Sequence, residues 1–159
     1  HVSALVVVIH VSRSWYLLLT ITQVGIGKSM LFSVLGNYYL APDGSCVCDY
    51  IHVVDVAKAH LVAIERLILK KNKSRYEIFN LGVGKGISVL ELINAFEKVT
   101  GVKLHYEIAA KRDGDASALY AATLLANKEL GWTAERNSHN LIKTAWNWAL
   151  HLAGRKDFL

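Results

Sequence analysis

The sequence predicts an α/β fold in a single region, residues 1–159. Short segments rich in β-branched and aromatic residues alternate with longer segments whose apolar residues recur at helical spacing. Turn signals such as Pro42-Asp43-Gly44 stand between them. Hydrophobic residues make up 53% of the chain, above the ~45–50% of average globular proteins. That excess suits a well-buried α/β protein or half of a larger domain.

The first elements are short. Residues 6–9 are all Val or Ile and predict a buried strand, and residues 17–27 predict a helix that ends at its glycines. Residues 30–35 predict a second strand. The segment Gly25-Ile26-Gly27-Lys28-Ser29 matches the end of a phosphate-binding P-loop, but Thr22 stands where that motif requires Gly. We therefore interpret it as a helix end.

The central stretch, residues 43–70, contains a turn, an extended segment and a helix in direct succession. Residues 46–54 alternate and are rich in β-branched and aromatic residues, which predicts an extended backbone for at least part of their length. From Asp55 the period changes to that of a helix, with apolar residues at 56, 59, 63 and 67. We expect Asp55 to be the N-cap of this helix, because a carboxylate can accept the unpaired N–H groups of a first turn.

The C-terminal half predicts two strands and three helices. The strands cover residues 76–81 and 102–109. Ser88-x-x-Glu91 is a capping box that opens a helix to Thr100, and a helix over 123–130 ends at Gly131. We expect Ser138 to cap the last helix. Its predicted apolar stripe is Leu141, Ile142, Ala145, Trp146, Ala149 and Leu152.

The glycine-rich turn at residues 82–86 follows a predicted strand and precedes a predicted helix, as a dinucleotide fingerprint would. Its spacing is G-x-G-x-G, and Ile87 occupies the position where the fingerprint needs its third Gly. We favour a tight turn and assign no cofactor-binding residue.

Composition argues against several kinds of partner. The net charge is +5, but Lys and Arg are spread along the chain beside acids, so we expect no nucleic-acid partner. His10 and Arg13 interrupt the N-terminal apolar run well short of the ~18–20 residues of a membrane span, so we expect no membrane partner. Cys46 and Cys48 lack further ligands at metal-binding spacing. We expect reduced thiols, no metal and a cytoplasmic location.

Several motifs together resemble one family. They read Asp49-Tyr50-Ile51-His52-Val53, Asp55, Ala57-Lys58-Ala59-His60, Asn80-Leu81-Gly82-x-Gly84, Arg112-Asp113-Gly114-Asp115 and Lys128-Glu129-Leu130-Gly131-Trp132. In this order and spacing they resemble the UDP-glucose (UDP-galactose) 4-epimerases of the extended short-chain dehydrogenase/reductase group. The likeness covers roughly residues 17–148 and only the C-terminal half of such an enzyme. It implies the C-terminal part of a doubly wound Rossmann-type sheet with a small mixed α/β substrate lobe, the N-terminal cofactor half being absent.

The resemblance also implies a binding site for a UDP-sugar. The backbone of Ser33, Val34 and Leu35 would contact the uracil. Arg112 would bind the diphosphate, because its planar guanidinium gives two charge-assisted hydrogen bonds. The rest of that loop is Asp113, Gly114 and Asp115. Asp115 would lie near the ribose, and Gly114 would allow the backbone to approach the substrate closely.

Two departures from the family pattern affect that site. Cys48 stands where the family normally has an Arg that contacts the diphosphate, and losing such a contact costs about 1.5–3 kcal/mol, or ten- to a hundred-fold in affinity. Trp15 and Tyr16 stand where the family has an Asn pair that helps hold the substrate.

By the same resemblance, the activity is that of an isomerase of galactose metabolism that interconverts UDP-glucose and UDP-galactose with NAD. That reaction needs a Tyr-x-x-x-Lys pair, and none of the seven tyrosines has Lys four residues later. We therefore assign no catalytic residue and expect this chain alone to be inactive. The alternatives are a non-catalytic nucleotide-sugar-binding module, or part of another nucleotide-sugar enzyme of the group, a 4,6-dehydratase or decarboxylase. The resemblance also allows a homodimer through the absent half.

Overall fold

The computed structural model describes residues 6–8, 14–36, 39, 41, 43–111 and 116–154, with side chains from residue 17 onward. Within this part, helices and short strands alternate, which confirms the predicted α/β class. In chain order the elements are β1 (Val6–Val8), α1 (Ser14–Gly25), β2 (Phe32–Leu35), β3 (Val47–Cys48), α2 (Val53–Ile68), β4 (Ile78–Asn80), β5 (Ile87–Ser88), α3 (Val89–Thr100), β6 (Tyr106–Ala109), β7 (Ala118–Leu119), α4 (Leu124–Leu130) and α5 (Ser138–Leu152).

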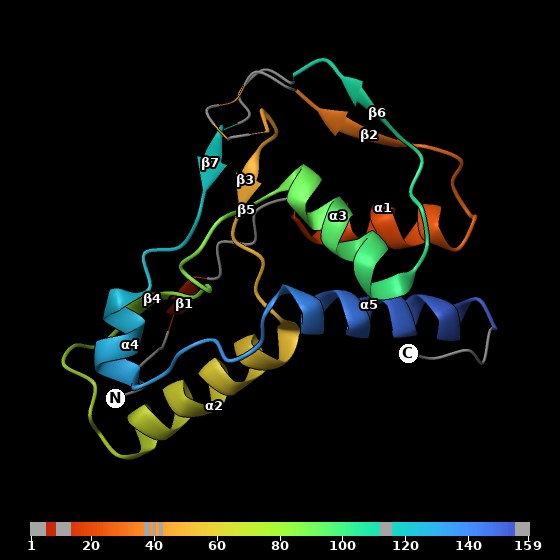
Figure 1. The fold of residues 1–159 in the computed structure, drawn as a ribbon. Helices are drawn as coiled ribbons and strands as arrows, with labels where there is room; N and C mark the ends of the chain where they lie inside the picture. Colours follow the sequence, from red (N-terminus) through yellow and green to blue (C-terminus); the bar gives the residue numbers. More distant parts are fainter. Residues whose placement is uncertain are drawn as a thin grey trace.

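The strands form three small sheets. β1 pairs parallel with β4, and β2 pairs parallel with β6. The third sheet has the order β5-β3-β7, with β3 antiparallel to β5 and parallel to β7. Figure 1 shows the β2–β6 sheet at one end of an elongated molecule, the β1–β4 sheet toward the other, and the third sheet between them.

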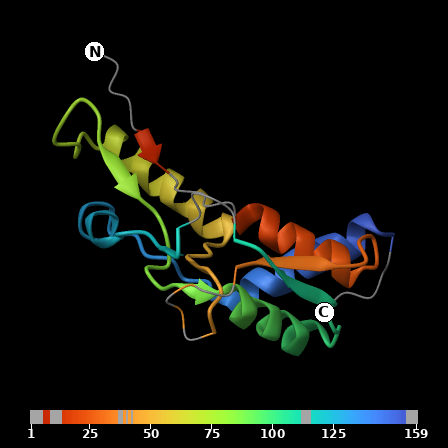
Figure 2. The same cartoon turned by 90° about the horizontal axis from the view of Figure 1, so that it is seen from above.

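Two apolar clusters make the core. The larger one lies between α1, β2, α3 and α5, where the rings of Phe96 and Trp146 meet edge to face with centroids 5.3 Å apart. The smaller one joins α2, β4 and α4 around Phe79, Leu81 and Trp132. In Figure 2 the helices α1, α3 and α5 gather at one end and α2 lies at the other, so each cluster has its own set of helices.

The N-terminus of α2 differs from the prediction. The N-cap is His52, whose Nδ1 accepts a hydrogen bond from the Val54 N–H at 3.1 Å. Asp55 is therefore not the cap but the third residue of the helix, fully buried. The prediction was wrong because it considered only the residues next to the helix and not the partners of Asp55 that lie far away in the sequence.

The buried Asp55 carboxylate connects the two clusters. It accepts hydrogen bonds from the backbone N–H groups of Glu135 (3.2 Å) and Arg136 (2.9 Å), and from the Arg136 guanidinium at 2.6 Å. The Asp55 carbonyl accepts the Trp132 indole N–H at 3.1 Å. Next to it, His52 Nε2 lies 3.0 Å from Thr144 Oγ1 on α5. These contacts tie α2, in the smaller cluster, to α5 in the larger one.

Most other elements agree with the sequence analysis. The capping box of Ser88 and Glu91 is confirmed, and α4 ends at Gly131 in the left-handed conformation. The last helix is capped by Asn137, which forms its own capping box with Asn140, and not by Ser138.

Several boundaries shift by a few residues. The first helix begins at Ser14, three residues earlier than expected, and β4 and β6 are shorter than the segments that predicted them. Strand β1 confirms the segment 6–9 over its first three residues, and Ile9 lies outside the described part. In the predicted stripe of α5, Leu152 is 59% exposed and Leu150 is buried. No helix in the described ranges is long and apolar enough to cross a membrane.

Replacing the buried carboxylate by an amide tests its role. Asp55→Asn keeps the shape but sets an NH₂ group against N–H donors, so we expect the free energy of unfolding to fall by about 1.5–3 kcal/mol. Urea denaturation measures it. The matched control is Glu135→Gln, because the Glu135 side chain is 61% exposed and pairs with Lys58 at the surface. It should change stability by at most about 1 kcal/mol. Equal losses in both variants would contradict the role of Asp55.

The His52 cap makes stability depend on pH. Burial lowers the pKa of His52, the nearby Arg136 lowers it further, and Asp55 opposes them. The folded chain therefore keeps His52 neutral where the unfolded chain takes up a proton, so the free energy of unfolding is highest above the ordinary His pKa of about 6.5 and falls as pH drops below it. Urea denaturation between about pH 7.5 and about pH 5.5 should show a smaller loss in His52→Asn, which retains a capping side chain. His139→Gln, at an exposed position, is the control. Parallel pH profiles for wild type and His52→Asn would disprove the assignment.

Candidate functional site

The first predicted site segment is strand β2. Its Ser33 is exposed, and its hydroxyl donates to Glu107 Oε1 at 3.2 Å. Val34 is 1% exposed and packs in the larger cluster, whereas Leu35 is half-buried. The strand pairs with β6 along one edge. In the part of the chain that the structure describes, no strand pairs with its other edge. The predicted contact between the backbone of this strand and uracil stays a prediction.

The second predicted site segment, Arg112 to Asp115, lies outside the described residues, but both of its flanks are described. On one side, the ammonium of Lys111 lies 5.0 Å from the centre of the Tyr39 ring, within the range of a cation–π contact. Lys111 also lies against Gly36, whose N–H donates to the Ala109 carbonyl at 2.9 Å. On the other side, the Ala116 carbonyl accepts the Cys46 S–H at 3.2 Å. The flanks therefore stand beside the end of β2 and the start of β3.

Gly36 allows this close arrangement. Its φ is +75°, in the left-handed region that favours glycine, and a Cβ there would lie 2.7 Å from the Tyr39 ring. A Cβ on Gly36 would also lie 3.4 Å from the Cβ of Lys111. The structure thus brings the end of the first predicted segment next to the residue that precedes the second, although about seventy-five positions separate them in the sequence.

The glycine-rich turn is held by Asp49. Its carboxylate accepts the N–H groups of Val83 and Gly84, each at 2.9 Å, and that of Ala121 at 3.3 Å. A Cβ on Gly82 would stand 2.4 Å from a carboxylate oxygen of Asp49. A cofactor phosphate would need these backbone N–H groups, but in this turn they already donate to Asp49. Sequence reasoning gave Asp49 no role of its own, because the turn that it binds lies more than thirty positions further along the chain.

Cys48 lies on the middle strand of the third sheet, opposite Ile87 of β5 and Leu119 of β7. It is half-buried, as is Cys46, and their sulfurs are 3.9 Å apart. Burial raises the pKa of the neighbouring Tyr50 hydroxyl, and the two thiols raise it further, so this phenol stays neutral. The position where the resemblance expected a cationic side chain thus carries a thiol.

The histidines nearest to the thiols in the sequence have other contacts. His52 caps α2, as described above, and His60 Nδ1 lies 2.8 Å from the Val56 carbonyl within the same helix. Within the described ranges, no group of three or more His, Cys, Asp and Glu side chains is placed to hold a metal ion.

A second polar cluster lies at the opposite end of the molecule and was not foreseen. Arg66 is 8% exposed and donates to both carboxylate oxygens of Glu77 at 2.8 and 3.0 Å, and to Glu129 at 3.3 Å. Lys73 pairs with Glu129 at 2.6 Å. The hydrogen bond from Arg66 lowers the pKa of Glu77, which keeps it ionised.

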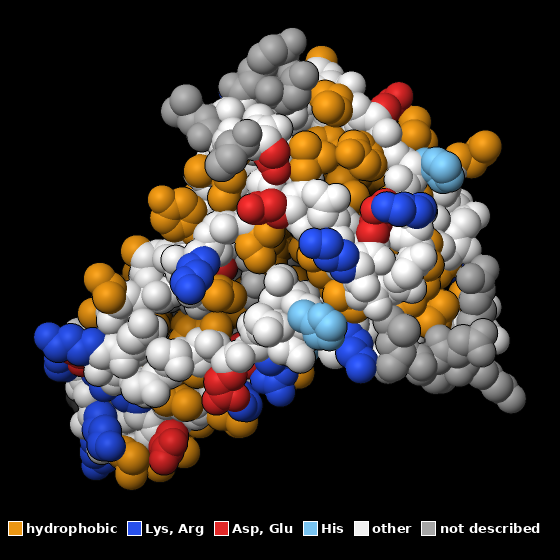
Figure 3. All heavy atoms as spheres, viewed as in Figure 1, with side chains coloured by type: hydrophobic (Ala, Val, Ile, Leu, Met, Phe, Trp, Pro, Cys, Tyr) orange, Lys and Arg blue, Asp and Glu red, His pale blue; other side chains and the backbone are white. Residues whose placement is uncertain are grey.

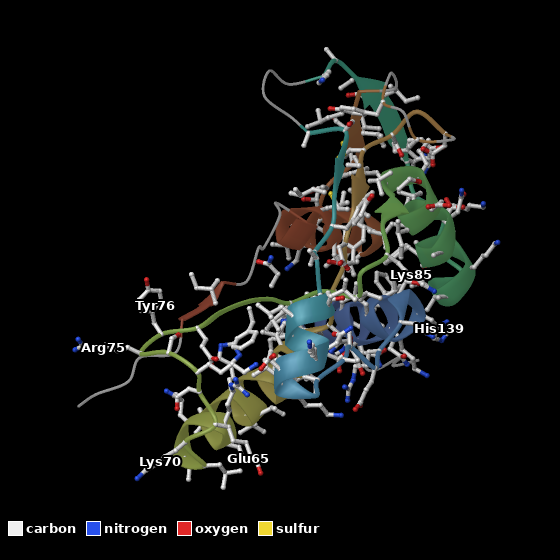
Figure 4. The ribbon with its side chains drawn as sticks, turned by 90° about the vertical axis from the view of Figure 1, so that its left-hand side faces the viewer. Glu65, Lys70, Arg75, Tyr76, Lys85 and His139 are labelled. Carbon is white, nitrogen blue, oxygen red and sulfur yellow. The ribbon has the colours of Figure 1, made fainter. Side chains whose placement is uncertain are left out.

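A cavity of about 220 Å³ borders this cluster and is lined by Lys73, Glu77, Ile78, Phe79, Leu125 and Glu129. Figure 4 shows Arg75 and Tyr76 pointing away from the body at this end, beyond Glu65 of α2. The acids and bases of this cluster pair with one another, so we interpret it as a structural contact that connects α2, β4 and α4. It lies far from β2.

Comparison with known proteins places the chain in context. No protein-family model matches it. It is 44% identical over 128 residues to the human UDP-glucose 4-epimerase, and 45% identical over 128 residues to that of Haemophilus influenzae. Each match covers 80% of this chain, but the chain spans only 36% and 37% of these relatives' lengths.

Solved structures agree. A UDP-glucose 4-epimerase from Stenotrophomonas maltophila, with bound NAD and formylated UDP-arabinopyranose, matches 87% of this chain and 40% of its own with a TM-score of 0.83 and 40% identity. One from Bifidobacterium longum, in complex with NAD⁺ and UDP, matches 82% of this chain and 38% of its own with a TM-score of 0.76 and 40% identity. In sequence and in fold, the chain therefore resembles less than half of a UDP-glucose 4-epimerase, which fits the C-terminal half.

Proposed function

We propose that this chain is the UDP-sugar-binding part of a UDP-glucose 4-epimerase, and that it interconverts UDP-glucose and UDP-galactose only together with polypeptide that carries the cofactor. The observation that supports the proposal is that the first predicted site segment lies beside a flank of the second. The end of β2 lies beside Lys111, the residue before Arg112. This supports one binding surface made from a strand edge and a loop.

Each segment has a chemical task in this proposal. The backbone of Ser33, Val34 and Leu35 contacts the uracil, with the N–H and C=O groups of Ser33 and Leu35 at the open edge of β2. Val34 faces β6, because its neighbours at i±2, Phe32 and Gly36, donate to that side. Arg112 binds the diphosphate with its forked guanidinium, and Asp115 accepts from ribose hydroxyls. Because Cys48 provides no cation, the diphosphate depends on the loop, and binding is about ten- to a hundred-fold weaker than with an arginine there.

The cofactor does not fit the residues present. The glycine turn donates its N–H groups to Asp49, and the sequence has no Tyr-x-x-x-Lys pair. NAD, which is bound in the structural neighbours, would supply hydride transfer when held by the other part of the enzyme. We propose no reaction step on this chain alone.

The remaining expectations stay proposals. Figure 3 shows Lys and Arg at separate places from the α2 end to the α5 end of one face. Along the sequence, too, Lys and Arg are spread beside acids, and we propose no nucleic-acid partner. We also propose the cytoplasm as the compartment, because the chain has only two cysteines and both are thiols. A homodimer would form through the absent half.

Binding of UDP tests the substrate assignment. We expect Arg112→Ala to weaken UDP binding by about ten- to a hundred-fold, because it removes a charge-assisted contact worth about 1.5–3 kcal/mol. Isothermal titration of UDP measures it. The matched control is Arg75→Ala, which removes an equal charge at the far end of the molecule (Figure 4) and should bind UDP like the wild type. If both variants bind equally, Arg112 is not in the site.

Complementation tests the enzymatic part. The chain is mixed with the N-terminal half of a UDP-glucose 4-epimerase, and conversion of UDP-galactose to UDP-glucose is measured. We expect no turnover from either part and activity from the mixture, because the missing pair and the cofactor come with the added half. Tight UDP binding with no turnover in the mixture would instead support a non-catalytic nucleotide-sugar-binding module. Conversion of the UDP-sugar to a 4-keto-6-deoxy or decarboxylated product would support the dehydratase or decarboxylase alternative.

A further inference from the structure

The thiols of Cys46 and Cys48 form a pair whose geometry is set by the strand that carries them. Residues i and i+2 of an extended segment point to the same side, and the two sulfurs lie 3.9 Å apart. The segment is hydrogen-bonded on both sides: the Val47 N–H donates to Ser117, the Asp49 N–H to Leu119, and the Cys46 carbonyl accepts from Val89. The pair is therefore held in place by β5 and β7.

This geometry does not suit a disulfide. Two residues of an extended strand place their Cα atoms about 6.4–6.8 Å apart, at the upper limit of the ~4.4–6.8 Å found across disulfides. The sulfurs would also have to approach to about 2.05 Å. To form the disulfide, the backbone around Cys46 and Cys48 would have to move and would break hydrogen bonds to the neighbouring strands.

The same geometry suits chelation of one ion. Two thiolates at about 2.3 Å from a tetrahedral ion such as Zn²⁺ have their sulfurs about 3.8 Å apart, and the observed separation is 3.9 Å. Both side chains are half-buried, so an ion has access from solvent. The Ala116 carbonyl, 3.2 Å from the Cys46 sulfur, lies on the same side.

The sequence alone predicted no metal at these two thiols; from their separation in the structure we propose instead that Cys46 and Cys48 form a bidentate dithiolate site for a soft, thiophilic metal ion. Binding releases the two thiol protons, and each sulfur then donates an electron pair to the ion. Because no third protein ligand of the His, Cys, Asp or Glu type stands nearby in the described ranges, water or a small external ligand completes the coordination. This suits ions that prefer sulfur, such as Cu⁺ and Zn²⁺. The proposal does not depend on the proposed enzymatic function.

Cadmium binding tests the site. The reduced protein is titrated with Cd²⁺ in buffer without other thiols, following the ultraviolet charge-transfer band of cadmium thiolate, and native mass spectrometry gives the stoichiometry. We expect the wild type to bind one Cd²⁺ per chain. Cys46→Ser and Cys48→Ser should each bind Cd²⁺ at least about 100-fold more weakly, since in the wild type the second thiolate binds intramolecularly at high effective concentration. The chain has no other cysteine, so the double variant sets the background. His60→Gln, at an exposed histidine with no place in the pair, should bind like the wild type, and circular dichroism checks that each variant folds.

Three results would overturn the proposal: Cd²⁺ binding that survives in either serine variant, binding that depends on His60, or no one-to-one complex in the folded wild type. A separate incubation with oxidised glutathione tests the competing outcome. Rapid loss of two hydrogens from the wild-type mass, with release of two reduced glutathione molecules and no cadmium complex, would identify a redox disulfide in place of a metal site.

Discussion

The arrangement of this molecule depends on one buried carboxylate. Asp55 is fully buried, and removing a carboxylate from water costs several kcal/mol unless donors surround it. Two backbone N–H groups and the guanidinium of Arg136 supply those donors. Their positions fix the segment before α5 against the first turn of α2. The smaller apolar cluster is thereby held in one orientation to the larger one, which apolar packing, having no direction, would not do by itself.

The motif that carries the family resemblance is mainly structural. Asp49 holds the glycine turn, His52 caps α2 and contacts α5, and Asp55 binds the segment before α5. These three polar side chains of one short stretch each bind a segment far away in the sequence. The stretch therefore sets the relative placement of the sheets, and the substrate contacts we propose lie elsewhere, on β2 and in the loop after β6.

Elements defined by local chemistry were predictable from the sequence. Ser88 and Glu91 are close enough in sequence for their capping box to be recognised, and Gly131 ends α4 as its conformational freedom suggests. Asp55 was misassigned because its partner Arg136 lies 81 positions away, beyond any local pattern. The predicted site also depends on residues that are distant in the sequence. The structure places β2 beside a flank of the loop, but Arg112 to Asp115 lie outside the described residues, so their role stays a prediction.

The thiol at position 48 changes the electrostatics that the proposed site requires. A diphosphate carries charge that needs cations to offset its desolvation. Cys48 supplies no cation, so the proposed site depends on the charges of Arg112 and Lys111. The Lys111 ammonium lies over the Tyr39 ring. A metal ion at Cys46 and Cys48 would not restore that cation. Binding releases two thiol protons, so the site would stay neutral with Zn²⁺ and would carry a net charge of −1 with Cu⁺. The charge that offsets a diphosphate would therefore have to come from other residues.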